Sequence, residues 1–440
     1  MVWKTTEYSG WGRVRTATAE LARPERASTL KNALADTSCP AIGNCRSYGD
    51  ASLNDGGRAI DMTRMNRILD FNGDTGVVTV EAGVTIATLA KVFAPQGWLP
   101  AVMPGTGFAT VGGCIAQDVH GKNHHNEGSF GQHVLSVTLL NGEKRTVATP
   151  DRNAGLFRAT MGGIGQTGVI SEAKLQLKPC PGDVMMVTER RAADWDEHLA
   201  HLDGSQATYC VGWIDATATG ASLGRGIVEE AELAAGLLPK AKPAKKVPLD
   251  APNFALSGPI VRSFNNAYYR RVPTSGRSSV KRIDEFFFPL DKIHDWNRLY
   301  GKRGFYQFQN VVPLDQADAL KAMLKEIAGA GLASPLAVLK RMGPGRAGPM
   351  SFPMEGYTLA VDFPARDAAP ELIAMLEDMT VDAGGRLYLA KDALATGPAI
   401  KAMYPEHGDW VKAVNKADPE HTLETDMVRR LDLRTAGGAS

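Results

Sequence analysis

The sequence predicts an α+β protein of two domains, and three observations support this fold class. The chain has 440 residues, which is more than one ordinary hydrophobic core accommodates. Its first 180 residues alternate short β-rich runs, glycine turns and helical segments. After Cys180 the composition changes, and a mixed sheet with helices on one side is the economical architecture for residues 184–385.

The first elements can be assigned from local patterns. Residues 76–84 (GVVTVEAGV) carry a β-branched run that ends at a glycine, which is typical of a strand. Residues 85–98 (TIATLAKVFAPQGW) have apolar residues at helical spacing, so we expect a helix that Pro95 and Gly97 close. Residues 133–150 place two β-rich runs around an Asn-Gly pair, which is the best hairpin signal in the chain.

Residues 168–180 alternate apolar and polar side chains, as a half-buried strand does. A G-x-G-x-x-G pattern at Gly163, Gly165 and Gly168 precedes this strand and follows a segment that looks helical. A dinucleotide site needs the opposite order, with a strand before the glycines and a helix after them. The sequence therefore does not predict a Rossmann site.

The second half begins with an unusual connection. Residues 231–258 are rich in Ala, Pro and Lys, with four lysines between positions 240 and 246. We expect a mobile basic loop, either a solvated connection or a flap that meets a phosphate or an anionic membrane surface. Beyond it we expect strands at 284–291 (DEFFFPLD), 304–314 and 356–364, and a helix at 314–330.

The composition also excludes some classes of protein. Forty-nine basic and 48 acidic side chains leave a formal net charge of +1, so no global electrostatic signature of nucleic-acid binding exists. The N-terminus lacks the apolar core of a signal peptide, and no run approaches a membrane span. The five cysteines form no C-x-x-C pair, so we expect a cytoplasmic protein with at most peripheral membrane contact.

Three glycine-rich segments carry the clearest functional signal. They are residues 41–50 (AIGNCRSYGD), 103–113 (MPGTGFATVGG) and 118–134 (DVHGKNHHNEGSFGQHV). Glycine and small hydroxyl residues let the backbone approach a ligand and present several N–H groups to a diphosphate. The third segment also contains four of the nine histidines, which raises a metal site as the competing interpretation.

A metal site would make the chain a metal-dependent hydrolase, with His120, His124 and His125 as ligands. Zinc sites need further ligands in a defined geometry and outer hydrogen-bond partners, and no H-E-x-x-H helix occurs here. The interspersed glycines also argue against a rigid scaffold of ligands. We therefore expect no metal, and we expect structural roles for His124, His125 and His133.

Several motifs together resemble a known family. They are RSYGD, PGT followed by TVGG, the histidine segment and the terminal KADPEHTLETDMVRRLDL, joined by DKIHDWNRLYG, GFYQFQNVVP, MSFP and GGRLYLAKD. The chain is similar to flavin-dependent oxidoreductases of the vanillyl-alcohol-oxidase type, and within them to the decaprenylphosphoryl-β-D-ribose 2′-oxidases. The resemblance implies a two-domain PCMH-type FAD-binding fold with an inserted mixed-sheet substrate domain. The FAD domain would comprise residues 1–183 and 386–440, with the substrate domain at 184–385.

The resemblance assigns the FAD-lining positions to the glycine segments and to two later residues. They are Ala41, Gly43, Asn44, Cys45, Arg46, Ser47, Tyr48, Gly49, Asp50, Gly105, Thr110, Val111, Gly112, Gly113, Gln117, His120, Ile170 and Tyr388. Cys45 departs from the family, which has a second glycine there in G-x-G-R-S. Related sugar oxidases attach the flavin to a histidine where this chain has Arg46, so the resemblance implies non-covalent FAD.

The same comparison implies Lys391, His120 and Tyr48 as catalytic residues. Lys391 would face flavin and substrate, where a cation stabilises negative charge and a desolvated amine can accept a proton. The substrate-lining positions implied by the resemblance are Lys122, Gln307, Gln309, Lys340, Thr358 and Ala360. The mycobacterial pattern has asparagine and cysteine at the last two, and that cysteine is the residue that nitro-aromatic suicide inhibitors modify.

The implied reaction oxidises a secondary alcohol, the ribose C2′ hydroxyl of a polyprenyl-phosphoryl pentose, to a ketone. A separate NAD(P)H-dependent keto-reductase would be the partner that completes the ribose-to-arabinose epimerisation. An FAD-dependent oxidase of a free sugar, alditol or aldonolactone is the alternative within the same chemistry.

Overall fold

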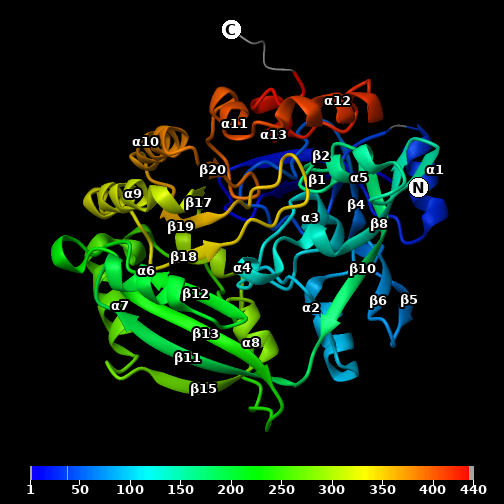
Figure 1. The fold of residues 1–440 in the computed structure, drawn as a ribbon. Coiled ribbons are helices and arrows are strands. Elements are labelled where there is room, and N and C mark those ends of the chain that lie inside the picture. The colour runs from blue at the N-terminus through cyan, green and yellow to red at the C-terminus, as the bar shows by residue number, and fades with distance from the viewer. Residues whose placement is uncertain (1, 37, 436–440) are drawn as a thin grey trace.

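The computed structural model describes residues 2–36 and 38–435, and the α+β fold class is confirmed (Figure 1). A four-stranded sheet contains β1 (Lys4–Ser9), β2 (Thr16–Ala22), β3 (Ala41–Ile42) and β4 (Arg58–Asp61). β1 pairs antiparallel with β2, whereas β4 pairs parallel with both β2 and β3. Because β3 ends at Ile42, this sheet fixes the start of the first glycine segment.

A second sheet is antiparallel throughout, in the order β5-β6-β10-β8-β9 with β7 paired to β10. Its strands are β5 (Ile68–Asn72), β6 (Val77–Glu81), β7 (Trp98–Pro100), β8 (Val134–Asn141), β9 (Lys144–Ala148) and β10 (Val169–Pro179). The predicted strands at 76–84 and 168–180 are confirmed, as is the hairpin, in which Asn141 pairs with Lys144.

Short helices surround these two sheets. They are α1 (Ala27–Asp36), α2 (Ile86–Phe93), α3 (Val111–Ala116), α4 (His124–Glu127) and α5 (Ala154–Thr160). The predicted helix at 85–98 is confirmed: Thr85 caps it, and Gly97 ends it in the left-handed region at φ +81°. The G-x-G-x-x-G pattern lies between α5 and β10, which confirms the helix–turn–strand order that excluded a Rossmann site.

The second half is organised around an eight-stranded sheet in the order β15-β11-β13-β12-β18-β19-β17-β20. Its strands are β11 (Val184–Ala192), β12 (Tyr209–Ile214), β13 (Gly226–Ala234), β15 (Arg277–Arg282), β17 (Phe305–Val312), β18 (Ala337–Met342), β19 (Gly356–Pro364) and β20 (Arg386–Leu387). All of these strand pairs are antiparallel, which differs from the mixed sheet expected for this part. The parallel pair here is the short β14 (Lys245–Lys246) with β16 (Ile293–His294).

Helices accompany this sheet, namely α6 (Trp195–Gly204), α7 (Gly258–Arg270), α8 (Ile283–Phe287), α9 (Ala317–Ala330) and α10 (Ala369–Asp382). Figure 1 shows α9 and α10 beside β17 and β19, with the green strands β11, β13 and β15 extending away from them. The buried side chains of α9 join the core formed with β17–β19.

The predicted strand at 284–291 was wrong, because α8 covers its first half. Asp284 and Glu285 occupy the first turn of the helix, where carboxylates are favourable, and Pro289 cannot extend it. Phe286 and Phe287 are each 1% exposed, and both rings pack against Tyr209. Tertiary packing of consecutive aromatic rings therefore decided this segment rather than strand propensity.

The predicted loop at 231–258 is partly ordered at its edges. β13 continues to Ala234, the two residues of β14 pair with β16, and a 3-10 turn covers 253–256. The remaining stretches, 235–244 and 247–252, lie outside helices and strands. No helix within residues 2–36 and 38–435 is long and apolar enough to cross a bilayer.

The C-terminal segment returns to the N-terminal sheets. It contains α11 (Gly397–Met403), α12 (His407–Ala417) and α13 (Asp426–Arg430), which lie at the top of Figure 1 in orange and red. Arg430 donates to Asp50 at 2.7 Å and 2.9 Å and to Asp392 at 2.7 Å. The first glycine segment is thus tied to the C-terminal helices by a largely buried charge cluster.

Candidate active site

One face of three neighbouring strands, β17, β19 and β18, forms the floor of the candidate site. Residues that pair across these strands are Gln307 with Asp362, Gln309 with Ala360, and Lys340 with Thr358. Side chains two positions apart on a strand point to the same face. The predicted alternation of Gln307 and Gln309 is therefore observed, and the register adds partners from two further strands.

His120, in the histidine-rich segment 118–134, lies against this face of the sheet and contacts Gln309 and Lys340. His120 is 8% exposed, and Lys340 Nζ lies within hydrogen-bond distance of His120 Nδ1, at 3.0 Å. The side-chain amide nitrogen of Gln309 lies 3.1 Å from His120 Nε2 and 3.4 Å from the hydroxyl of Thr358. Burial, followed by the positive charge of Lys340, holds the pKa of His120 well below its usual value. His120 is therefore a neutral imidazole near neutral pH.

The aromatic rings of Tyr388 and Phe352 pack beside His120. The Tyr388 ring lies 5.5 Å from the His120 ring and stacks on Phe352 at 4.6 Å between centroids. The Tyr388 hydroxyl donates to the carbonyl of Gln117 at 3.4 Å, and its backbone N–H donates to the Gln309 carbonyl. Three predicted cofactor-lining residues, Gln117, His120 and Tyr388, are thus brought together.

The other predicted catalytic residues also meet. Lys391 Nζ lies 3.6 Å from the centre of the Tyr48 ring, and the Tyr48 N–H donates to the Ala390 carbonyl at 2.9 Å. Burial lowers the pKa of Lys391 to about 8, although the carboxylate of Asp362 favours the ammonium form. Burial, reinforced by Asp362, raises the pKa of Tyr48 well above its usual value. Tyr48 is therefore a neutral phenol at physiological pH.

Asp362 is the functional candidate that the sequence analysis missed. It is fully buried, and its carboxylate accepts hydrogen bonds from Gln307 Nε2 and from the Tyr300 hydroxyl at 3.1 Å. Burial raises the pKa of Asp362, while Gln307 and Lys391 oppose that shift. The signal was present in the sequence, since Thr358, Ala360 and Asp362 alternate along one strand and must share a face.

Three half-buried lysines lie in this region of the structure. Burial, reinforced by the charges of Lys122 and Lys391, lowers the pKa of Lys340 to about 7. Burial also lowers the pKa of Lys122 to about 8. Lys122 Nζ donates to the Phe286 carbonyl and lies 3.9 Å from the centre of that ring. A half-buried cluster of lysines, with Asp362 near Lys391 and Glu229 near Lys122, is suited to an anionic ligand.

The first two glycine segments touch each other. A Cβ built on Gly43 would lie 2.4 Å from the Thr110 hydroxyl, so a side chain there would push the two loops apart. Asn44 Nδ2 donates to the Phe108 carbonyl at 2.8 Å, which joins the loops again. At Gly105 a Cβ would meet no protein atom within 4 Å, so this stretch borders open space.

Cys45, which stands where the family has a second glycine, and the following Arg46 have distinctive surroundings. Cys45 adopts φ +48°, so it occupies the left-handed region that favours glycine. Arg46 stacks on Trp11 at 4.0 Å and on Phe108 at 4.8 Å. Its buried Nε has no hydrogen-bond partner among the described residues. An unpaired guanidinium N–H beside joined glycine loops fits the phosphates of FAD.

The remaining predicted cofactor positions adjoin these loops. Thr110 caps α3 by accepting from the Gly113 N–H at 3.2 Å, and the Gly112 N–H donates to Ala82. Ala82 in turn donates to the carbonyl of Ser171, which places β10 and its buried Ile170 next to α3. Val111 packs into the same core as Ile170. Ala41 begins β3, and Ser47 and Gly49 flank Tyr48 in the loop that follows this strand.

The other histidines make structural hydrogen bonds. His124 Nδ1 accepts from the Gly343 N–H at 3.2 Å. The ring of His125 bonds to the Ala207 carbonyl, and that of His133 bonds to the Glu127 carbonyl. Within residues 2–36 and 38–435, no group of three or more His, Cys, Asp or Glu side chains is arranged to hold a metal ion.

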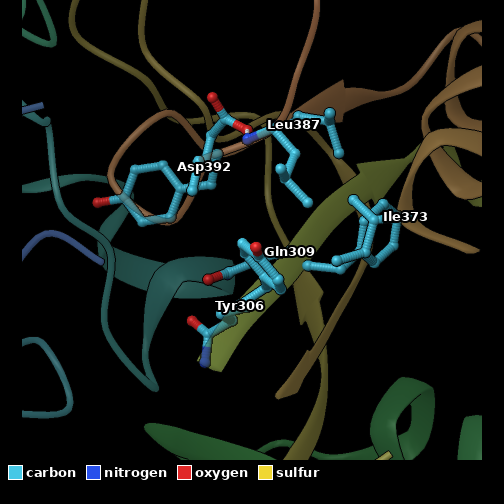
Figure 2. Close-up of a pocket in the computed structure, with 10 residues that line it drawn as sticks. Tyr306, Gln309, Ile373, Leu387 and Asp392 are labelled. Atoms are coloured by element: carbon cyan, nitrogen blue, oxygen red, sulfur yellow. Dashed lines mark hydrogen bonds between the residues drawn. The ribbon is translucent and has the colours of Figure 1, made fainter. Parts of the chain in front are cut away.

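A small pocket opens between β17 and the segment that follows β20 (Figure 2). Its lining residues are Tyr306, Gln307, Phe308, Gln309, Ile373, Leu387, Tyr388, Asp392, Ala393 and Leu394. In Figure 2, Asp392 and Leu387 lie on one side of the pocket and Tyr306 and Gln309 on the other. Asp392 accepts from the Leu394 and Ala395 N–H groups, so its carboxylate stabilises the turn that carries Lys391.

Comparison with known proteins identifies the family. The FAD binding domain family matches residues 22–150. The decaprenylphosphoryl-beta-D-ribose oxidase of Mycolicibacterium smegmatis is 37% identical over 452 aligned residues, which cover 98% of each chain. An uncharacterised protein of Streptomyces coelicolor is 32% identical over 80% of this chain and 100% of its own length. L-gulonolactone oxidase of Mus musculus is 25% identical over 40% of this chain and 41% of its own. This chain therefore belongs to the decaprenylphosphoryl-β-D-ribose oxidase family of FAD-dependent oxidoreductases.

Proposed function

We propose that this enzyme oxidises the C2′ hydroxyl of a polyprenyl-phosphoryl ribose to the ketone, the first half of a ribose-to-arabinose epimerisation. The observation that carries the proposal is the half-buried lysine cluster, in which Lys340 Nζ lies 3.0 Å from His120 Nδ1 and is close enough to Lys122 and Lys391 for their charges to lower its pKa. Such a site compensates the negative charge of a phosphodiester, which a free sugar does not carry. The M. smegmatis relative is named for the same substrate class.

The protein residues supply orientation and electrostatics for this reaction. FAD, when bound, accepts the hydride from the carbinol carbon. Gln307 and Gln309 present amides to the sugar hydroxyls from the sheet floor. Lys391 provides a fixed cation above Tyr48, where negative charge that develops during oxidation is stabilised. Neutral His120, whose two ring nitrogens contact Lys340 and Gln309, holds both of these side chains in place beside the substrate.

The alternative substrates receive less support. The similarity to L-gulonolactone oxidase of Mus musculus covers only 40% of this chain, whereas that to the M. smegmatis relative covers 98%. An alditol or aldonolactone also offers no anionic group for the lysines. For a metal-dependent hydrolase, the histidine side chains would have to leave the backbone hydrogen bonds they make.

The fate of the product and the location of the enzyme follow from this substrate class. The product ketone would pass to an NAD(P)H-dependent keto-reductase, and the epimer would serve arabinan biosynthesis in the cell wall. The five cysteines, all in described positions, are unpaired, which suits a cytoplasmic protein with peripheral membrane contact. We also propose that the chain has an FAD domain, formed by residues 1–183 and 386–440, and a substrate domain, formed by residues 184–385. Residues 1, 37 and 436–440 of these ranges lie outside the described structure.

The test is anaerobic mixing of the holoenzyme with a short-chain polyprenyl-phosphoryl ribose. We expect bleaching of the visible flavin absorbance and a keto product detected by mass spectrometry. Free ribose and an aldonolactone serve as comparison substrates. Faster bleaching by either of these than by the phosphoryl ribose would refute the proposed substrate class.

A first prediction concerns the flavin linkage. Arg46 occupies the position of the attaching histidine and is held between two aromatic rings, so it offers no nucleophile to the flavin. After acid precipitation of the purified protein, all the yellow colour is expected in the supernatant. Colour retained in the pellet, with a mass increase equal to FAD, would contradict this expectation.

A second prediction concerns Ala360. It lies half-buried on the sheet floor between Gln309 and Val338, where the resemblance places the cysteine that nitro-aromatic inhibitors modify. We expect no covalent adduct on this chain, because Ala360 has no thiol. The Ala360→Cys variant is expected to form a one-to-one adduct by intact-protein mass spectrometry. Adduct formation by the unsubstituted chain would place the reactive residue elsewhere.

A further inference from the structure

One stretch of the surface is unusually rich in exposed apolar side chains. Six of the fourteen large apolar side chains that are exposed among the described residues lie within residues 237–264. They are Leu237, Leu238, Leu249, Phe254, Ile260 and Phe264. The exposed fraction reaches 95% at Leu237, 74% at Leu249 and 68% at Phe254. A concentration of exposed apolar side chains in one stretch of chain is typical of an interaction site.

Hydrogen bonds join this stretch to residues 282–298, which run beside it. The Pro239 carbonyl accepts from Arg282, and the Lys245 N–H donates to the Lys292 carbonyl at 2.7 Å. Further along, the Ala251 N–H donates to the Arg298 carbonyl at 2.9 Å. We call residues 237–264 the basic strip. Exposed Leu299, on the adjoining segment, extends its apolar surface.

The strip is also locally basic. It contains five basic side chains and one acidic side chain, a local excess of four positive charges in a chain whose net charge is +1. The acidic residue, Asp250, is already neutralised by Arg13 at 2.7 Å and by Arg298. Lys240, Lys242 and Lys245 are exposed and form no ion pair with any described residue. Their charge is available to an external anion.

The strip lies one aromatic layer away from the candidate site. Leu256 and Trp296 pack against the cluster of Tyr48, Tyr300 and Phe305. The Tyr300 ring stacks on Phe305 at 4.1 Å, and Phe305 contacts Tyr48 at 5.3 Å. A cavity of about 330 Å³ at the same place is lined by Leu256, Leu299 and Tyr300, and by the arginines Arg303 and Arg366.

We propose that the basic strip docks the enzyme on an anionic lipid bilayer beside its active site. Exposed leucine and phenylalanine side chains interleaved with lysines are the pattern that binds at a bilayer surface, with the apolar groups inserted and the lysines against anionic headgroups. Charge complementarity commits the strip to an anionic bilayer rather than to a neutral one. The proposal rests on the proposed function only for its purpose, since a polyprenyl substrate resides in a membrane.

The experiment is flotation of the full-length holoenzyme with vesicles of phosphatidylcholine, with or without phosphatidylglycerol. We expect binding to the phosphatidylglycerol vesicles alone, weakening as salt is added. The variants K240Q/K242Q/K245Q and L249S/F254S are each expected to lower that binding about tenfold or more. The control variant K91Q/V92S changes an exposed lysine and an exposed apolar residue on α2 and is expected to bind as the unsubstituted protein does.

Unchanged binding by both strip variants, or equal binding to vesicles without phosphatidylglycerol, would overturn the assignment. So would a dimer in light scattering that the strip variants dissociate, because a second copy of the chain would then be the occupant. FAD content and oxidation of a short-chain, water-soluble phosphoryl ribose are expected to be unchanged in all variants. Failure of the proposed function would instead appear as absent oxidation in every protein, whether or not vesicles bind.

Discussion

Replacing Lys391 by methionine is expected to lower kcat/KM for the phosphoryl ribose about 10²–10³-fold near neutral pH, with FAD still bound. Methionine keeps the length of the side chain but removes the cation that lies 3.6 Å from the Tyr48 ring. A preorganised charge in a site that excludes water stabilises charge developing in the transition state far more than it would in solvent. Stopped-flow bleaching of the flavin measures the loss, and flavin content with the thermal midpoint reports folding.

The pH dependence separates the two roles open to Lys391. Its pKa is lowered to about 8, so the ammonium form predominates near neutral pH and is lost as the pH rises through that value. If the cation is the active form, kcat/KM falls about tenfold per pH unit above about pH 8. The Lys391→Arg variant is expected to retain part of the activity and to lose this alkaline fall, because a guanidinium stays charged throughout.

The opposite profile is the informative contradiction. A kcat/KM that rises through about pH 8 would mean that the neutral amine accepts the proton of the alcohol. In that case Lys391→Arg would be as inactive as Lys391→Met. Lys122→Met is the matched control. Lys122 donates to the Phe286 carbonyl and is a predicted substrate-binding residue. Its replacement is therefore expected to raise KM more than it lowers kcat.

The glycine segments that we predict to line the cofactor could be recognised in the sequence because the signals that mark them are local. Gly43 and Thr110 belong to segments whose small residues permit close approach, and the structure brings that pair into contact. The helix at 85–98 carries its own signals in the same way, with a threonine cap and a closing glycine. By contrast, the aromatic run at 284–291 has strong strand propensity, and only the packing of Phe286 and Phe287 against Tyr209 makes it helical.

The electrostatics of the site could not be obtained from local patterns. Lys122 precedes Lys340 by 218 residues and Lys391 follows it by 51, and their effect on one another depends on burial in a common volume. Family resemblance named each lysine separately, but the lowered pKa of Lys340 follows only from their proximity. Asp362 was missed for a related reason, because an acidic residue between apolar neighbours looks like a solvent-facing strand position until its partners Gln307 and Tyr300 are known.

Asp362→Asn is expected to lower kcat/KM about tenfold or more near neutral pH and to move the alkaline fall to lower pH. The carboxylate favours the ammonium form of Lys391, so its removal lowers the pKa of that lysine further. The asparagine can still accept from Gln307 or from the Tyr300 hydroxyl, which keeps the local network hydrogen-bonded. A simple loss of packing would reduce activity equally at every pH and would leave the position of the fall unchanged.

The stability of the same variant provides an independent check. Burial raises the pKa of Asp362, so the folded state resists its ionisation and loses stability, relative to an asparagine, as the pH rises above the ordinary carboxyl range. Without its counter-charge, buried Lys391 is penalised most at low pH, where it is protonated, and that cost also declines as the pH rises. Both contributions have the same sign. The thermal midpoint of Asp362→Asn minus that of the unsubstituted protein should therefore increase from about pH 5 to about pH 9. A difference that stays constant or decreases over this range would show that the carboxylate is not held in the destabilised, buried state that the site geometry implies.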